Sequence, residues 1–204
     1  AFQKALDIDP QHPGVKYLIN ELVNLRNSDL EDLERMDYNN LIQQGLVYLE
    51  NRVYDKAAIL FNKALDLKPK SAIGRYNLGV VYYGQGRLDR AQTQLNSAIA
   101  ERDDHAPSFH MRGSIMMAKG DKEKAISDYT QALTLDHNYW LAYNNRGITY
   151  ASLGEFKMAL NDFNKVIELN EDYATAYFNR GLLYQSGFQQ LGLQELDGIS
   201  MAIN

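Results

Sequence analysis

The 204-residue sequence contains no cysteine, which excludes disulfide bonds, thiolate metal sites and cysteine nucleophiles. Basic residues are also in deficit: 21 lysines and arginines stand against 26 acidic residues, for a formal net charge of −5. This balance provides no positive field for phosphate groups, so nucleic acid is not an expected partner. The sequence has no run of about 18 apolar residues, so we expect no direct insertion into a membrane.

Patterns typical of catalysis and metal binding are missing as well. The four histidines do not have the spacing of metal ligands, and no glycine-rich loop or strand-to-helix turn presents phosphate-binding groups or a nucleophile. We therefore predict a protein that is not an enzyme, with no catalytic residue, no metal and no cofactor.

What the sequence does contain is a period of 34 residues. The residues that recur at this spacing are Gly45, Gly79, Gly113, Gly147, Gly181, Ala57, Ala91, Ala125 and Ala159. A period of this length is typical of arrays in which one small helical unit is copied and stacked. In each copy, apolar and small residues follow helical spacing in two segments, which predicts two amphipathic helices per unit.

The recurring glycine would lie inside the first of these helices. Glycine in a helix interior costs about 1 kcal/mol relative to alanine, so its repetition predicts that another helix packs closely against it. A second set of glycines falls between the two helices of the units, in the stretches 84–87, 118–121 and 153–155, whereas the stretch 51–54 has none. We expect a tight turn at each of these connections.

Counted from Tyr38 as position 1 of the first unit, these residues resemble the tetratricopeptide repeat family, which has leucine at position 7, glycine at position 8, tyrosine at position 11, alanine at position 20, an aromatic residue at position 24, alanine at position 27 and proline at position 32. The clearest matches are Gly45, Tyr48, Ala57, Phe61, Ala64, Pro69, Leu78, Gly79, Tyr82, Ala91, Ala98, Gly147, Tyr150, Ala159 and Phe163. The tryptophan position of the family instead holds Leu41, Arg75, Phe109, Tyr143 and Tyr177. The resemblance implies an all-α fold, a right-handed α-solenoid of stacked 34-residue helix-turn-helix units.

The period divides the chain into segments. The repeat array is predicted over 38–187, with units at 38–71, 72–105, 106–139 and 140–173 and the first helix of a fifth unit at 174–187. Residues 188–204 are predicted to be a degenerate second or capping helix. Residues 1–12 match the end of a preceding, truncated repeat, and residues 13–37 are either a divergent helical repeat or a connector.

A row of amides is the sharpest functional signal. Position 6 of the first helix holds Gln43, Asn77, Asn145 and Asn179, with Met111 in the remaining unit. A carboxamide both donates and accepts hydrogen bonds, so such a row can pair with the backbone of an extended peptide. The resemblance implies a ladder of this kind, facing a concave groove. The alternative is that these amides pack between helices or face solvent.

The resemblance also implies that positions 2, 5, 6, 9, 12 and 13 of the first helix face that groove, with side-chain pockets at positions 5 and 9. The predicted pocket residues are Tyr76, Val80, His110, Asn144, Ile148, Phe178 and Leu182. Some family members hold the C-terminal carboxylate of chaperone tails with a lysine at position 5, an asparagine at position 9 and further cations on the following units. Such cations are missing here, so we expect no binding of that kind through these repeats.

Three arginines at position 7 are an alternative candidate site for an anion. The units that contain Arg112 and Arg146 also contain Asp128 and Asp162 near position 23, and the unit of Arg180 has Glu195 after a one-residue slip. The other units have Leu78 with Gln94 and Gln44 with Leu60. Because charge and countercharge occur together, we predict ion pairs between the two helices of a unit.

We therefore predict a non-enzymatic protein interaction scaffold that binds an extended peptide or a partner helix in its concave groove. The alternatives are a structural role through self-association, or a regulatory arm of a larger protein. The partner is expected to be a protein or peptide, and a homo-oligomer is left open. We favour the cytoplasm, but the sequence begins within a repeat, so a preceding signal or anchor is left open.

Overall fold

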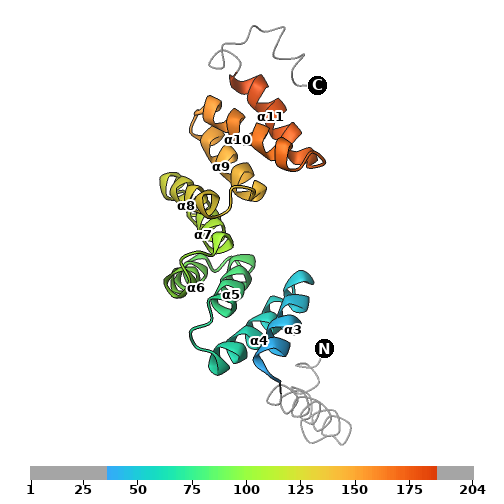
Figure 1. Cartoon of the computed structure of the whole chain (residues 1–204), viewed down its shortest axis with the longest axis vertical. Helices are drawn as coiled ribbons and strands as arrows, with labels where there is room; N and C mark the ends of the chain where they lie inside the picture. The colour runs from blue at the N-terminus through green and yellow to red at the C-terminus, as the bar shows by residue number, and fades with distance from the viewer. Residues whose placement is uncertain (1–35, 188–204) are drawn as a thin grey trace, which may run out of the picture.

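The computed structural model describes residues 36–187. In this range the chain forms nine α-helices and no strand, arranged as an elongated stack (Figure 1). The helices are α3 (Tyr38–Glu50), α4 (Tyr54–Leu67), α5 (Ala72–Gly84), α6 (Leu88–Glu101), α7 (Ala106–Ala118), α8 (Lys122–Leu135), α9 (Trp140–Ser152), α10 (Phe156–Leu169) and α11 (Ala174–Gly187).

The helices follow the period of the sequence. Each odd-numbered helix begins 34 residues after the previous odd-numbered helix. Polar side chains cap the N-termini of some of these helices. At α3 the N–H of Asn40 donates to Asp37 Oδ1 at 2.8 Å, and at α5 the N–H of Gly74 donates to Ser71 Oγ at 3.0 Å. These caps satisfy amide groups that the first turn of a helix leaves without a partner.

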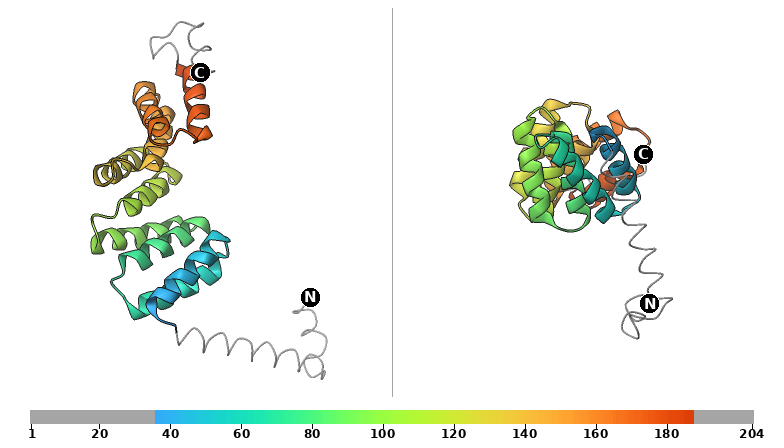
Figure 2. Two further views of the ribbon diagram at one scale, coloured as in Figure 1. Left: turned by 45° about the vertical axis from the view of Figure 1, so that its right-hand side comes forward. Right: turned by 90° about the horizontal axis from the view of Figure 1, so that it is seen from below.

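The core is distributed along the stack. Its buried residues form four clusters, each made by neighbouring helices, and consecutive helix pairs are rotated about the long axis (Figure 2). From α5 to α9, each odd-numbered helix contacts the even-numbered helices on both sides in the chain, and consecutive odd-numbered helices from α3 to α11 also contact each other. This arrangement confirms the predicted all-α helical repeat solenoid, in which units bury their apolar faces against their neighbours.

The close packing predicted at the helical glycines is present. A Cβ atom added to Gly45, Gly113 or Gly147 would lie 2.5, 2.8 or 2.9 Å from the aromatic ring at position 24 of the same unit. Those rings belong to Phe61, Tyr129 and Phe163, which are almost fully buried. The absence of a side chain at position 8 therefore lets the ring of the second helix lie against the backbone of the first.

The turn between the two helices of a unit needs a left-handed residue at position 15. Glycine occupies it three times, at Gly86, Gly120 and Gly154, with φ of 73°, 85° and 79°. In the first unit the same position is Arg52, with φ of 59°. The left-handed conformation costs roughly 1–2 kcal/mol for a residue with a Cβ atom, so the first turn is strained relative to the others.

Replacing Arg52 with glycine is expected to raise the free energy of unfolding by about 1 kcal/mol, because it removes this strain. Urea unfolding followed by circular dichroism would measure the change. The control is Arg87→Gly: Arg87 is also exposed but has φ of −85°, so glycine there should stabilise nothing. Equal effects of the two substitutions would contradict the explanation.

Two of the three arginines at position 7 make the predicted ion pairs. Arg112 donates through Nε and Nη2 to Asp128 at 2.8 and 2.6 Å, and Arg146 donates in the same way to Asp162 at 2.9 and 2.8 Å. Both carboxylates are buried. These two arginines are therefore held within the fold as parts of its packing.

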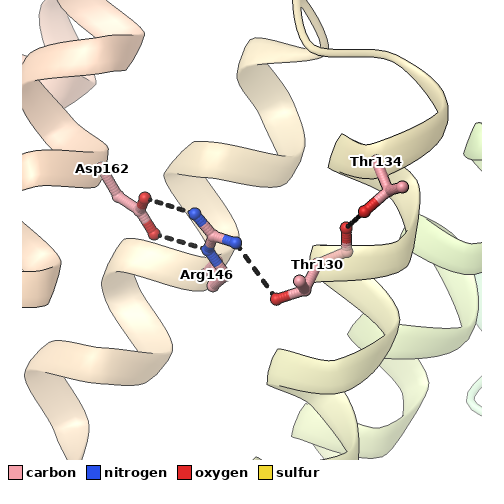
Figure 3. A network of polar contacts seen from close by, with 4 residues as sticks. All are labelled: Thr130, Thr134, Arg146 and Asp162. Atoms are coloured by element: carbon pink, nitrogen blue, oxygen red, sulfur yellow. Dashed lines mark hydrogen bonds and ion pairs between the residues drawn. The ribbon is translucent and has the colours of Figure 1, made fainter.

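The structure adds a third contact that the sequence did not suggest. Arg146 Nη1 also donates to Thr130 Oγ1 of the preceding unit at 3.1 Å, so the guanidinium joins α9 to both α10 and α8 (Figure 3). Arg112 and Arg180 bond Asn96 and Asn164, at the equivalent position 25, at 3.0 Å. Each arginine thus links its own unit to the one before it.

Several predictions concern residues outside 36–187. These are the assignments of 1–12, 13–37 (apart from its last two residues) and 188–204, and the pairing of Arg180 with Glu195. They stay predictions, as does the division of the array into units. Within 36–187, no helix combines the length and the apolar character needed to cross a membrane.

Candidate functional site

The candidate groove residues lie on the odd-numbered helices, with different degrees of exposure. Asn77, His110 and Asn144 are buried, whereas Tyr76, Val80, Asn145 and Asn179 are partly exposed. Gln43 is exposed. Among the apolar candidates, the most exposed side chains are those of Phe178 at 65%, Leu182 at 46% and Ile148 at 38%. The solvent-facing apolar candidates therefore lie on α9 and α11, and Ile73 and Tyr83 add exposed apolar surface on α5.

Four of the predicted residues form a chain of hydrogen bonds from α11 to α7. Asn179 Nδ2 donates to Asn144 Oδ1 at 3.3 Å, and Asn144 Nδ2 donates to Asn145 Oδ1 at 3.1 Å. Asn145 Nδ2 then contacts His110 Nε2 at 3.0 Å. The chain runs across three successive odd-numbered helices, and Gln43 and Asn77 are not members of it.

The hydrogen bond that His110 receives from Asn145 determines the tautomer of the imidazole ring. Because Asn145 Nδ2 can only donate, His110 Nε2 must be the unprotonated acceptor, and Nδ1–H donates to Tyr139 Oη at 3.1 Å. Burial lowers the pKa of His110 to about 4, so the ring is neutral at pH 7. Burial also raises the pKa of Tyr139 and raises that of Tyr129 to about 12.

The amides therefore use part of their hydrogen-bonding capacity on each other. Asn145 directs one N–H toward His110, while Ser114 Oγ lies 3.5 Å from the same nitrogen. Among the described residues, the side-chain oxygen of Asn179 accepts no hydrogen bond. The buried Asn144 is therefore assigned to helix packing, whereas the partly exposed Asn179 keeps an acceptor for a hydrogen bond from a ligand.

Two hollows open beside this chain of amides. The first, of about 240 Å³, is lined by Tyr83, Ser114, Met117, Ala118, Tyr129, Asn145 and Ile148. The second, of about 350 Å³, is lined by Ile148, Ala151, Phe156, Phe163, Asn179, Leu182, Leu183 and Ser186. Ile148 borders both, so the hollows adjoin, and each contains one amide from position 6 among mainly apolar side chains.

The sequence did not single out several of these lining residues. Tyr83, Met117 and Ala151 share position 12, about one helical turn beyond the pocket residues at position 9. Their shared position in the repeat is the sequence signal that could have identified them as lining residues. The ring of Tyr129 is buried in the core, and its hydroxyl donates to Ser114 Oγ at 3.3 Å, with both residues lining the first hollow. Phe156 comes from the second helix, so its position depends on how α10 packs.

Within residues 36–187 no group of three or more histidine, aspartate or glutamate side chains converges. The site is therefore described by shape, apolar contact and neutral hydrogen-bonding groups.

Comparison with protein families gives three matches. Models described as tetratricopeptide repeat match residues 42–107 and 140–173, and a model described as TPR repeat matches residues 113–154. Together they cover more than half of the chain. A comparison with curated protein sequences gave no match.

Solved structures with the same architecture include PilF from Pseudomonas aeruginosa, at 21% identity and a TM-score of 0.70, covering 81% of this chain and 76% of PilF. YrrB, a TPR protein with an unusual peptide-binding site, is 21% identical with a TM-score of 0.64, covering 100% of this chain and 91% of YrrB. The first TPR of Spaghetti (RPAP3), bound to the HSP90 peptide SRMEEVD, is 24% identical with a TM-score of 0.55, covering 57% of this chain and 93% of that one. The TM-scores show that these proteins share the fold of this chain, and at sequence identities this low the comparison shows nothing beyond the fold.

Proposed function

Because this chain belongs to the tetratricopeptide repeat family, whose repeats are protein interaction scaffolds, we propose that it binds an extended peptide segment of a partner protein in the groove formed by α5, α7, α9 and α11. It acts without catalysis. The observation that carries this proposal is the pair of adjoining hollows that share Ile148 and each contain an amide.

The groove residues have distinct roles in this proposal. Ile148 and Leu182 provide apolar surface that is exposed in the absence of a partner, and covering it is favourable. Asn179 accepts a hydrogen bond from a backbone N–H of the peptide, and Asn145 contributes through the lone pair that its neighbours leave. Tyr76, Val80 and His110 form the continuation of the groove wall toward α5, and Phe178 forms its edge at α11.

Two of the structures of similar fold support a peptide as the ligand. YrrB is described as having a peptide-binding site, and the TPR of Spaghetti holds a seven-residue peptide. A segment of extended chain also suits a groove that runs across successive helices, since it can contact each unit in turn.

The proposal is tested by selecting peptides that bind the folded protein from a displayed library of random peptides of about 12 residues. An extended peptide of this length can span the contiguous hollows. The affinity of an enriched peptide is then measured calorimetrically for the wild type and for Ile148→Glu. We expect the substitution to weaken binding at least about tenfold, because it places a charge at the wall that both hollows share.

The matched control is Ile59→Glu. Ile59 is 56% exposed on α4, a second helix outside the groove, so the same chemical change there should alter affinity less than about twofold. Circular dichroism establishes that both variants are folded. Failure to enrich any peptide, or equal affinity for the two variants, would contradict groove binding.

A further inference from the structure

The groove is unusual in its lack of charge. Charged residues make up 23% of the chain, yet at the six groove positions of the five first helices (positions 2, 5, 6, 9, 12 and 13) Glu50 alone is charged. His110 is the one histidine at these positions, and it is buried and neutral at pH 7. All of these positions lie within residues 36–187.

Lysines at the rim of the groove are already engaged. Lys119, at the end of α7, contacts Asp89 Oδ1 at 2.6 Å and Gln92 Oε1 at 2.7 Å. Lys122, at the start of α8, donates to the carbonyl oxygen of Ser152 at 3.0 Å. These cations are directed toward neighbouring helices, so they do not create a charged lining for the hollows.

A ligand with charged side chains would be poorly accommodated here. Moving a carboxylate or an ammonium group from water into a mainly apolar hollow has a large desolvation cost unless an opposite charge or several hydrogen bonds compensate for it. Each hollow offers one amide and hydroxyl groups but no opposite charge. Apolar side chains, by contrast, gain from the contact.

The spacing of the hollows limits the conformation of the ligand. The first hollow is lined mainly by α7 and α9, with one residue each from α5 and α8, and the second by α9 and α11 with two residues from α10. The first helices α7, α9 and α11 contact each other in succession. Packed helices lie about 8–10 Å apart. A polyproline II segment rises about 3.1 Å per residue with three residues per turn, so its side chains recur on one side every 9 Å or so.

Building on the proposed groove function, we infer that the partner is an uncharged segment in a polyproline II-like conformation, with an apolar side chain at every third position. Successive apolar side chains enter the hollows on either side of Ile148. The backbone between them, which has no internal hydrogen bonds in this conformation, bonds the amides of Asn145 and Asn179.

The enriched library peptides test this inference by their composition and salt dependence. We expect few charged residues, apolar residues three apart, and less than about a twofold change in Kd between about 50 and 500 mM salt, since no ion pair forms. Replacing one apolar anchor with glutamate should weaken binding at least about tenfold, and replacing a residue between the anchors with glutamine should change it less than about threefold. The peptide SRMEEVD, which carries three carboxylate side chains, is expected not to bind.

The two proposals fail in different ways. If no peptide is enriched, or if binding ignores Ile148→Glu, the groove function itself is wrong. If peptides bind in a manner that depends on Ile148 but are rich in acidic or basic residues, or lose affinity steeply with salt, the groove function stands and the inference about the partner is overturned. Anchors spaced two apart would reject the polyproline II-like conformation.

Discussion

Replacing Asp162 with glutamine is expected to lower the free energy of unfolding by about 3 kcal/mol, because it removes the carboxylate that receives two hydrogen bonds from Arg146. Arg146→Leu should cost about as much, because it leaves a carboxylate that is only 6% exposed without its cation. The burial of Asp162 already raises its pKa with Arg146 in place, so the ionised form is costly without that partner.

The double variant should be more stable than either single variant. Arg146→Leu with Asp162→Gln reproduces the pair Leu78 and Gln94, which the chain itself has at the equivalent positions of the second unit. It leaves no uncompensated charge, so we expect a loss of about 1 kcal/mol and a coupling energy of several kcal/mol. Urea unfolding at pH 7, followed through Trp140 fluorescence and circular dichroism, gives the four stabilities of the cycle.

An exposed ion pair provides the comparison for this cycle. Lys165 Nζ lies 2.6 Å from Glu168 Oε1, and the side chain of Glu168 is 66% exposed. Removing the charge of this lysine with Lys165→Gln should cost much less stability than either single variant of the buried pair, because solvent screens an exposed ion pair. If the loss of stability in the double variant equals the sum of the losses in the two single variants, Arg146 and Asp162 are not coupled. The ion pair would then be incidental to the packing of α9 and α10.

Acidification from pH 7 to pH 5 should cost the protein about 2 kcal/mol of stability through His110 alone. Burial lowers the pKa of His110 from 6.5 to about 4. Between these two values the unfolded chain binds a proton that the folded chain does not, so stability falls as the pH decreases through this window. The groups that face the ring are Tyr129, Tyr139 and Asn145, and none offers a negative charge to a protonated imidazole.

The variant His110→Gln isolates this contribution. Glutamine keeps a donor and an acceptor but does not titrate, so the stability of the variant should depend less steeply on pH between 5 and 7. Other groups, such as His105, whose pKa burial also lowers, titrate equally in both proteins and cancel in the difference. Parallel pH profiles for the wild type and the variant would show that His110 is freely protonated in the folded state.

Most of the fold could be predicted from the sequence, because residues needed for helix packing recur at the same position in every repeat and are recognised by that recurrence. The glycines at position 8 indicated close helix packing, and the rings of Phe61, Tyr129 and Phe163 lie against them. The joint occurrence of Arg146 and Asp162 indicated an ion pair that the structure contains. The period could not indicate that Arg146 also reaches Thr130, because that contact depends on the angle between consecutive units.

The candidate site was less predictable, since it is formed by contacts between side chains of different repeat units. The row of amides at position 6 is visible in the sequence, but its members differ: Asn145 and Asn179 join a chain of hydrogen bonds through Asn144 and His110, while Asn77 is buried apart from it. Positions that are equivalent in a repeat need not have equivalent neighbours, because each side chain also contacts the next unit.

The sequence by itself determined the helical units, their period, the turns between their helices and the near absence of charge at the groove positions, since each of these depends on residue type and spacing within one unit. Only the tertiary structure decided which amides bond each other, that His110 is buried beside Asn145, and that two hollows meet at Ile148. These features depend on how one unit is rotated against the next, and that rotation results from packing among side chains far apart in the sequence.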